Sequence, residues 1–116
     1  MDPHALAEAR SLALHRAVWA RIEAEPALLA GVRARLEQWR RDDSKPQPYV
    51  EAWLNLVSGP LEALKAALTG EDEVSLALRQ ATPFAGVIGA RERWHIWAET
   101  AKREAESAWN VASSST

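Results

Sequence analysis

The stretch RQATPFAGVIGARERW, residues 79–94, decides how the second half of the chain folds. Pro83, Gly86 and Gly89 predict a loop, because proline breaks a helix and glycine disfavours one. Its other residues are apolar: Phe84, Ala85, Val87 and Ile88. Two interpretations follow. Either the loop is interior and Phe84 inserts into the bundle, or Phe84, Val87 and Ile88 belong to an exposed apolar patch that binds another protein.

Helical patterns lie on both sides of this loop, and no β pattern competes with them. Pro26, Pro60 and Gly70 mark breaks between successive apolar faces. The expected helices span residues 3–24, 26–41, 49–57, 60–68, 71–80 and from about 90 onward. We therefore predict an all-α fold, a single compact bundle of five or six helices. It forms one domain over residues 1–112, followed by a flexible tail over residues 113–116.

Six tryptophans provide most of the large aromatic surface. Trp19, Trp39 and Trp53 lie on the apolar faces of the first three helices, so we expect them in the core. In the last helix the predicted inward stripe consists of Trp94, Trp97, Ala98, Ala101, Ala105 and Ala108. Trp109 falls off that stripe. It either folds back onto the domain or stays exposed as an anchor for a partner, because tryptophan is enriched in interface hot spots.

Composition excludes several classes of protein. The chain has 116 residues, 47% of them hydrophobic and 26% charged, which is typical of one globular domain. It lacks cysteine, which excludes a disulfide scaffold, a zinc finger and cysteine catalysis. No signal-like start and no apolar run of about 20 residues is present, so we expect a cytoplasmic protein and no membrane span.

Few side chains suggest chemistry. His95 has Glu92 and Glu99 at helical spacing, but a solvated, salt-bridged face explains this better than a metal site. Asp42 and Asp43 lie in the polar linker 42–48, where we expect them to be exposed rather than paired for acid–base catalysis. The loop lacks the lysine of a phosphate-binding loop. We therefore expect no enzyme, no catalytic residue, no metal and no cofactor.

Binding of nucleic acid is an alternative that the charges do not favour. The formal net charge is −2. A helix-turn-helix over 60–68 and 71–80 would begin its second helix with three acidic residues, which repel phosphates. The basic residues gather at Arg33, Arg35, Arg40 and Arg41, among Glu37, Asp42 and Asp43. Nucleic-acid binding by this chain alone is therefore not expected.

Three segments occur together in a pattern that resembles a known family: residues 11–18, Trp53 followed by residues 59–64, and residues 78–94. The pattern is similar to that of small helical bacterial domains that look like the antitoxins of toxin–antitoxin pairs, often encoded beside nucleotidyltransferase-type toxins. The resemblance covers about residues 10–97, and RQATPFAGV at 79–87 is its most specific part. It implies a protein partner and no catalytic residue. Such domains often follow a helix-turn-helix module, and we expect none here, because only eight residues precede Ala9 in this sequence.

We therefore predict a non-enzymatic protein-binding module, an antitoxin that neutralises a toxin by direct binding. The candidate contacts are Phe84, Val87, Ile88, Arg91, Trp94 and Trp109. Two alternatives stay open: a nucleic-acid-binding regulator and a self-associating structural helical domain.

Overall fold

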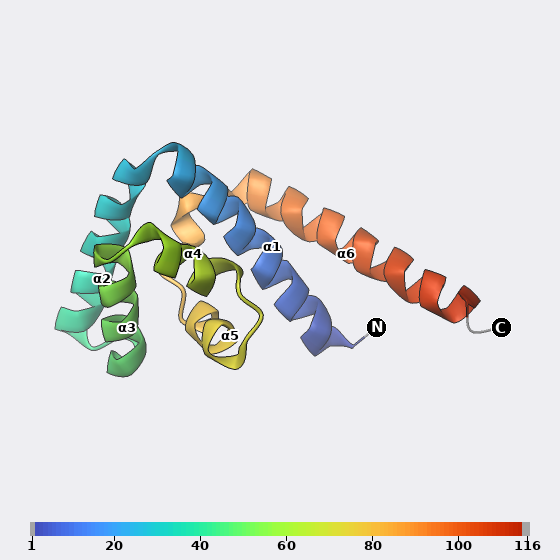
Figure 1. Cartoon of the computed structure of the whole chain (residues 1–116), viewed down its shortest axis with the longest axis horizontal. Coiled ribbons are helices and arrows are strands. Elements are labelled where there is room, and N and C mark those ends of the chain that lie inside the picture. Colours follow the sequence, from blue (N-terminus) through green and yellow to red (C-terminus); the bar gives the residue numbers. More distant parts are fainter. Residues whose placement is uncertain (1, 115–116) are drawn as a thin grey trace.

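The computed structural model describes residues 2–114, which contain eight helical segments, six of them α-helices, joined by short loops (Figure 1). They are α1 (Pro3–Ala24), η1 (Pro26–Leu28), α2 (Leu29–Asp42), α3 (Gln47–Ser58), α4 (Leu61–Thr69), α5 (Glu73–Gln80), η2 (Ala85–Val87) and α6 (Ala90–Ser114). The described residues form no strand, which confirms the all-α prediction. The first two residues of the predicted tail, Ser113 and Ser114, belong to α6. Residues 115 and 116 lie outside the described part.

Capping residues explain where several helices begin and end. The Asp2 carboxylate accepts a hydrogen bond from the backbone N–H of His4 at 3.0 Å, and Asp72 accepts one from Ser75 at 3.2 Å. Both bonds pair amides that the first turn of a helix leaves free. At the end of α2, Asp43 adopts a left-handed conformation with φ of 54°, which short polar residues tolerate. Asp2 and Asp72 therefore fix where α1 and α5 begin, and Asp43 fixes where α2 ends.

One hydrophobic core joins the helices. α1 packs against α6 and α4, α2 against α3, and α4 against α5. Trp53 and Phe84 lie at the centre with no exposed surface, and their rings meet edge to face with centroids 5.2 Å apart. The remaining buried hydrophobic residues are Leu14, Val18, Ile22, Val32, Leu36, Val50, Leu54, Val57, Leu64, Ala67, Leu68, Leu78 and Ile88. Trp53 is a core residue as predicted, and its indole N–H donates to the carbonyl of Leu78 at 2.9 Å.

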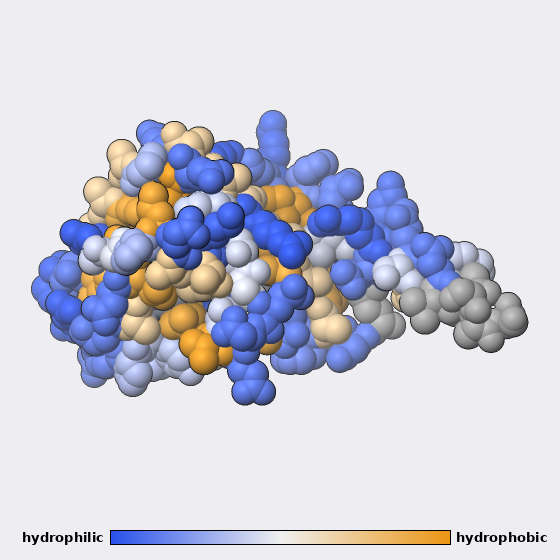
Figure 2. Space-filling model, viewed as in Figure 1, coloured by the Kyte–Doolittle hydropathy of each residue, from blue (hydrophilic) through white to orange (hydrophobic). Residues whose placement is uncertain are grey.

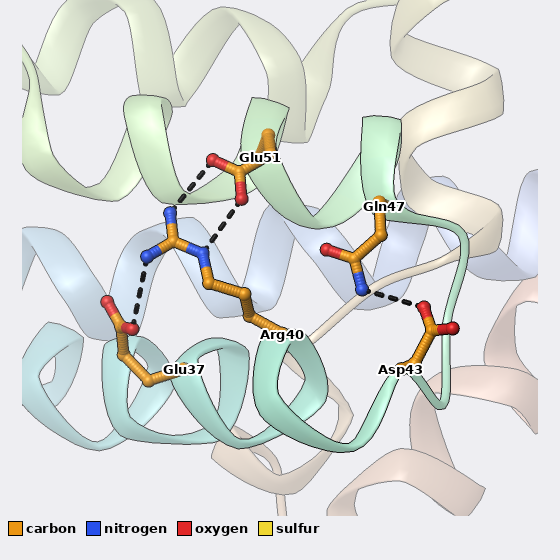
Figure 3. A network of polar contacts seen from close by, with 5 residues as sticks. All are labelled: Glu37, Arg40, Asp43, Gln47 and Glu51. Atoms are coloured by element: carbon orange, nitrogen blue, oxygen red, sulfur yellow. Dashed lines mark hydrogen bonds and ion pairs between the residues drawn. The ribbon is translucent and has the colours of Figure 1, made fainter.

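Polar contacts close the outer side of the α2–α3 pair (Figure 3). Arg40 donates from Nε and Nη2 to the two carboxylate oxygens of Glu51, both at 2.8 Å. Gln47 donates to the Asp43 carboxylate at 2.9 Å across the turn between the helices. The hydrogen bonds from Arg40 lower the pKa of Glu51. Asp42 and Asp43 are both exposed, as expected for a solvated linker.

The last helix extends beyond the bundle. α1 and α6 meet near the end of α1 and then diverge (Figure 1). The Cα radius of gyration is 15.8 Å, with extents of 55 × 27 × 25 Å. A compact chain of this length would have a radius near 13 Å, so the excess reflects the projecting helix. No helix within residues 2–114 combines the length and apolar character needed to cross a bilayer.

Candidate protein-binding surface

The loop between α5 and α6 is interior. Pro83, Phe84 and Ile88 are buried, the last two at 0% and 1% exposure, and Val87 is half-buried against the core. The first interpretation of the apolar loop is therefore confirmed for these residues. The prediction that Phe84 and Ile88 contact a partner is wrong for this conformation, because both side chains are closed inside the bundle.

A buried histidine holds the loop against α1. The Nδ1–H of His15 donates to the carbonyl of Ser11 at 2.7 Å, which leaves Nε2 as an acceptor. The Thr82 hydroxyl donates to Nε2 at 2.8 Å and accepts from the Phe84 N–H at 3.1 Å. Burial lowers the pKa of His15 to about 4, so the ring is neutral near pH 7. The sequence did not reveal this contact, because Thr82 lies 67 residues from His15.

The face that α6 turns to the bundle differs from the predicted one. Ile96 packs against the core and Thr100 is only 3% exposed. Thr100 can be buried because its hydroxyl donates to the Ile96 carbonyl at 2.7 Å within the same helix. At about 100° per residue, Trp94 and Ala98 lie well round the helix from Ile96 and Thr100. The predicted inward stripe therefore lies largely outside.

This outward face carries the exposed tryptophans of the chain. We call it the α6 stripe: Trp94, Trp97, Ala98, Ala101, Ala105 and Ala108, with Trp109 at its edge. Trp94 and Trp109 are 70% and 73% exposed, and they stand about 22 Å apart along the helix. Trp97 is 40% exposed, and the Arg10 guanidinium lies 5.9 Å from its ring centroid. Of the two possibilities for Trp109, the structure shows the exposed one.

Polar residues border the stripe. Arg91 is exposed in the first turn of α6. Figure 2 shows hydrophobic residues gathered over the bundle, whereas the projecting helix is mostly blue along its visible edge. The helix is therefore amphipathic, yet its apolar side is not the side that the bundle covers. An exposed aromatic strip with a polar rim is typical of a protein-binding site.

Val87 belongs to a different hollow. A cavity of about 260 Å³ is lined by Leu28, Gly31, Val32, Arg35, Pro83, Gly86 and Val87. None of the α6 stripe lines this cavity. The structure thus brings Arg91, Trp94 and Trp109 onto one helix and leaves Val87 at the junction of α2 and the loop.

Several of the polar side chains considered for chemistry or nucleic-acid binding pair within the chain. Glu92 pairs with Arg21, whose Nη2 lies 2.6 Å from Oε2. Within the described residues no three acidic or histidine side chains gather closely enough to hold a metal ion. Arg40 pairs with Glu51, and Arg33 donates to Ser58.

The candidate recognition helix α5 has no exposed cation to offer to a nucleic acid. Its one basic residue, Arg79, is 2% exposed. Recognition of bases or phosphates needs a side chain that reaches out of the protein, so α5 does not provide one.

Comparison with protein-family models, with curated proteins and with solved structures found no match to this chain. The surface of the chain and the motif at residues 78–94 are therefore the features that point to a function.

Proposed function

We propose that this chain is a non-enzymatic protein-binding module, an antitoxin that neutralises a cytoplasmic toxin by covering it with the α6 stripe. The observation that carries the proposal is the pair of highly exposed indoles, Trp94 and Trp109, on a helix that extends from the bundle. The motif resemblance of residues 78–94 supports the same class of partner, a nucleotidyltransferase-type toxin.

The stripe has the properties that binding requires. Large indoles provide apolar contact area, and the alanines between them let a partner helix approach closely. Because the backbone hydrogen bonds of α6 are made within the helix, its outer face can stay exposed without packing against the bundle. A stable complex buries about 800 Å² on each partner, and a helix face bounded by Trp94 and Trp109 can provide the centre of such an interface.

Two of the six sequence candidates, Phe84 and Ile88, now have a supporting role in this proposal. They anchor the start of α6 in the core and thereby fix where the stripe points. Arg91, Trp94 and Trp109 are the proposed contacts, and Trp97 joins them because it lies on the same face.

Co-expression with a nucleotidyltransferase-type toxin candidate taken from the neighbouring gene tests this function. The wild-type chain should relieve toxicity and co-purify with the toxin. Trp94→Ala and Trp109→Ala should each lose about 2 kcal/mol of binding free energy, roughly a thirtyfold rise in Kd. The matched control is Val74→Ala on α5, because Val74 is 68% exposed and apolar but lies off the stripe. Equal losses in the control and the tryptophan variants would contradict the assignment.

Self-association through the same stripe is the competing explanation. Light scattering of the isolated chain separates the two, because a dimer that Trp94→Ala dissociates would assign the stripe to a second copy. A monomer that forms a one-to-one complex with the toxin supports the antitoxin proposal.

A further inference from the structure

Arg79 is a buried cation whose guanidinium donates hydrogen bonds from only one of its three nitrogens. Its Nη1 donates to the carbonyls of Ala67 and Leu68 at 3.0 and 3.4 Å. These carbonyls belong to the last turn of α4, where the helix leaves them free. Within the described residues, Nε and Nη2 of Arg79 have no hydrogen-bond partner, although both atoms are closed to solvent. Such a group carries a desolvation cost that a hydrogen-bond acceptor would remove.

The unpaired side of the guanidinium has a defined geometry. Nε–H and Nη2–H point in parallel and match the two oxygens of a carboxylate or a phosphate. Arg79 lines a cleft of about 380 Å³ between α1, α5 and α6. The other lining residues are Ala5, Glu8, Ala9, Leu12, Arg16, Glu71, Leu76 and Glu104. Since one water occupies about 30 Å³ of liquid, this cleft has room for an acid group and several further atoms.

The charges around the cleft favour one of the two possible ligand groups, a carboxylate or a phosphate. Arg16 adds a second positive charge, whereas Glu8, Glu71 and Glu104 add three negative charges. A phosphate dianion would meet about twice the repulsion from these carboxylates that a monoanion meets. A carboxylate therefore fits the cleft better than a phosphate.

We propose that the cleft between α1, α5 and α6 binds a carboxylate, whose two oxygens accept hydrogen bonds from Nε and Nη2 of Arg79. The source is either a free small acid or an acidic side chain of a bound protein. This site is distinct from the α6 stripe, and it does not depend on the antitoxin function.

Glu8 is the lining residue that we expect to move when the ligand enters. It lines the cleft and also a neighbouring hollow of about 180 Å³ that Arg79 shares. Its carboxylate pairs with Nε2 of His4 at 2.9 Å, and both side chains are accessible to solvent. Displacement of such an exposed pair costs little, so the Glu8 side chain can swing away from Arg79.

Nitrogen-15 NMR of the full chain tests the site through the Nε–H resonance of Arg79, assigned by its loss in Arg79→Lys. The probes are sodium acetate, sodium phosphate at pH 7.5, and a capped alanine-based helical peptide with one glutamate, all at constant ionic strength. We expect acetate or the peptide to shift this resonance saturably, and phosphate to bind about tenfold more weakly. Tighter binding of acetate identifies a free acid as the source, and tighter binding of the peptide identifies a protein side chain.

A variant of Arg79 would also lose the hydrogen bonds to the end of α4. Two variants at other positions therefore test the site while Arg79 stays in place. Ala9→Leu fills the cleft and should weaken carboxylate binding at least about tenfold, with the Arg79 resonance still visible. Glu8→Gln keeps the size of the side chain and should tighten binding, because it removes a repelling charge. The proposal is overturned if no carboxylate moves the resonance, if phosphate binds as tightly as acetate, or if Ala9→Leu binds like the wild type. It is also overturned if Glu8→Gln without ligand shifts the resonance as far as acetate does, because Glu8 would then be the partner of Arg79.

Discussion

The loop at residues 81–89 and the α6 stripe are both rich in apolar side chains, but the bundle encloses only the loop. The loop is held by hydrogen bonds to its own backbone: Thr82 accepts from the Phe84 N–H, and the Phe84 carbonyl accepts from Val87 at 2.9 Å. A segment can be interior once its backbone groups are paired. A helix meets that condition anywhere, so α6 does not need to bury its apolar side. An apolar stretch is therefore buried where specific contacts fix it to the core. A loop held in this way can be more deeply buried than the apolar side of an amphipathic helix.

The largest expected effect comes from emptying the loop's central position. Phe84→Ala removes a fully buried ring that packs edge to face on Trp53. We expect a loss of about 3–5 kcal/mol in the free energy of unfolding, measured by urea denaturation. Val87→Ala is the control, and its loss should be clearly smaller, because Val87 is half-buried. A loss below about 1 kcal/mol for Phe84→Ala would mean that the loop is not part of the core.

The pH dependence of stability tests how the loop is attached to α1. His15 has a pKa of about 4 in the folded chain against 6.5 when unfolded. Above pH 6.5 the ring is largely neutral in both states, so its titration does not change the free energy of unfolding there. As the pH falls from 6.5 to 4 the unfolded chain binds the proton first, and the free energy of unfolding should drop by about 3 kcal/mol before levelling off.

Comparison with His15→Gln isolates this contribution. Asp42, Glu51 and Asp72 have lowered pKa values, so they lose their stabilising effect only as the pH falls below about 4.5, at the lower end of the histidine window, and they do so in both proteins. Chemical denaturation of both proteins at several pH values should therefore show a steep slope between pH 6.5 and 4 in the wild type alone. Parallel curves would mean that His15 is not buried and neutral.

A smaller effect is expected from the hydroxyl that joins the histidine to the loop. Thr82→Val keeps the shape of the side chain but leaves His15 Nε2 and the Phe84 N–H without their partner. The expected loss is about 1–3 kcal/mol in urea denaturation. Thr82→Ser, which keeps the hydroxyl, should recover most of it. If serine and valine destabilise equally, packing of the methyl group matters more than the hydrogen bonds.

The smallest effect on stability is expected on the stripe. Trp94→Ala and Trp109→Ala remove indoles that are 70% and 73% exposed, and alanine favours the helix. The free energy of unfolding should change by less than about 0.5 kcal/mol in each variant. A loss as large as that of Phe84→Ala would show that the stripe is core, and the contrast between the two regions would disappear.

Most of the helix boundaries could be predicted from the sequence, because Pro26, Pro60 and Gly70 act on their immediate neighbours. The orientation of α6 could not, because periodicity assigns the most apolar side to the interior. In this chain the covered side includes Thr100, whose hydroxyl bonds within the helix. The burial of His15 and Arg79 was also missed, since the groups that pair with them lie 67 and 12 residues away.

The six indoles differ widely in exposure, with Trp19 and Trp39 partly buried against the core, and this difference has a spectroscopic consequence. Trp53 has no exposed surface, whereas Trp94, Trp97 and Trp109 are already in contact with water in the native chain. Intrinsic fluorescence should therefore redshift only modestly on denaturation, since half of the emitters report an aqueous surrounding from the outset. Docking of another macromolecule on the last helix should shift the emission to the blue, so the chain carries its own optical reporter of complex formation.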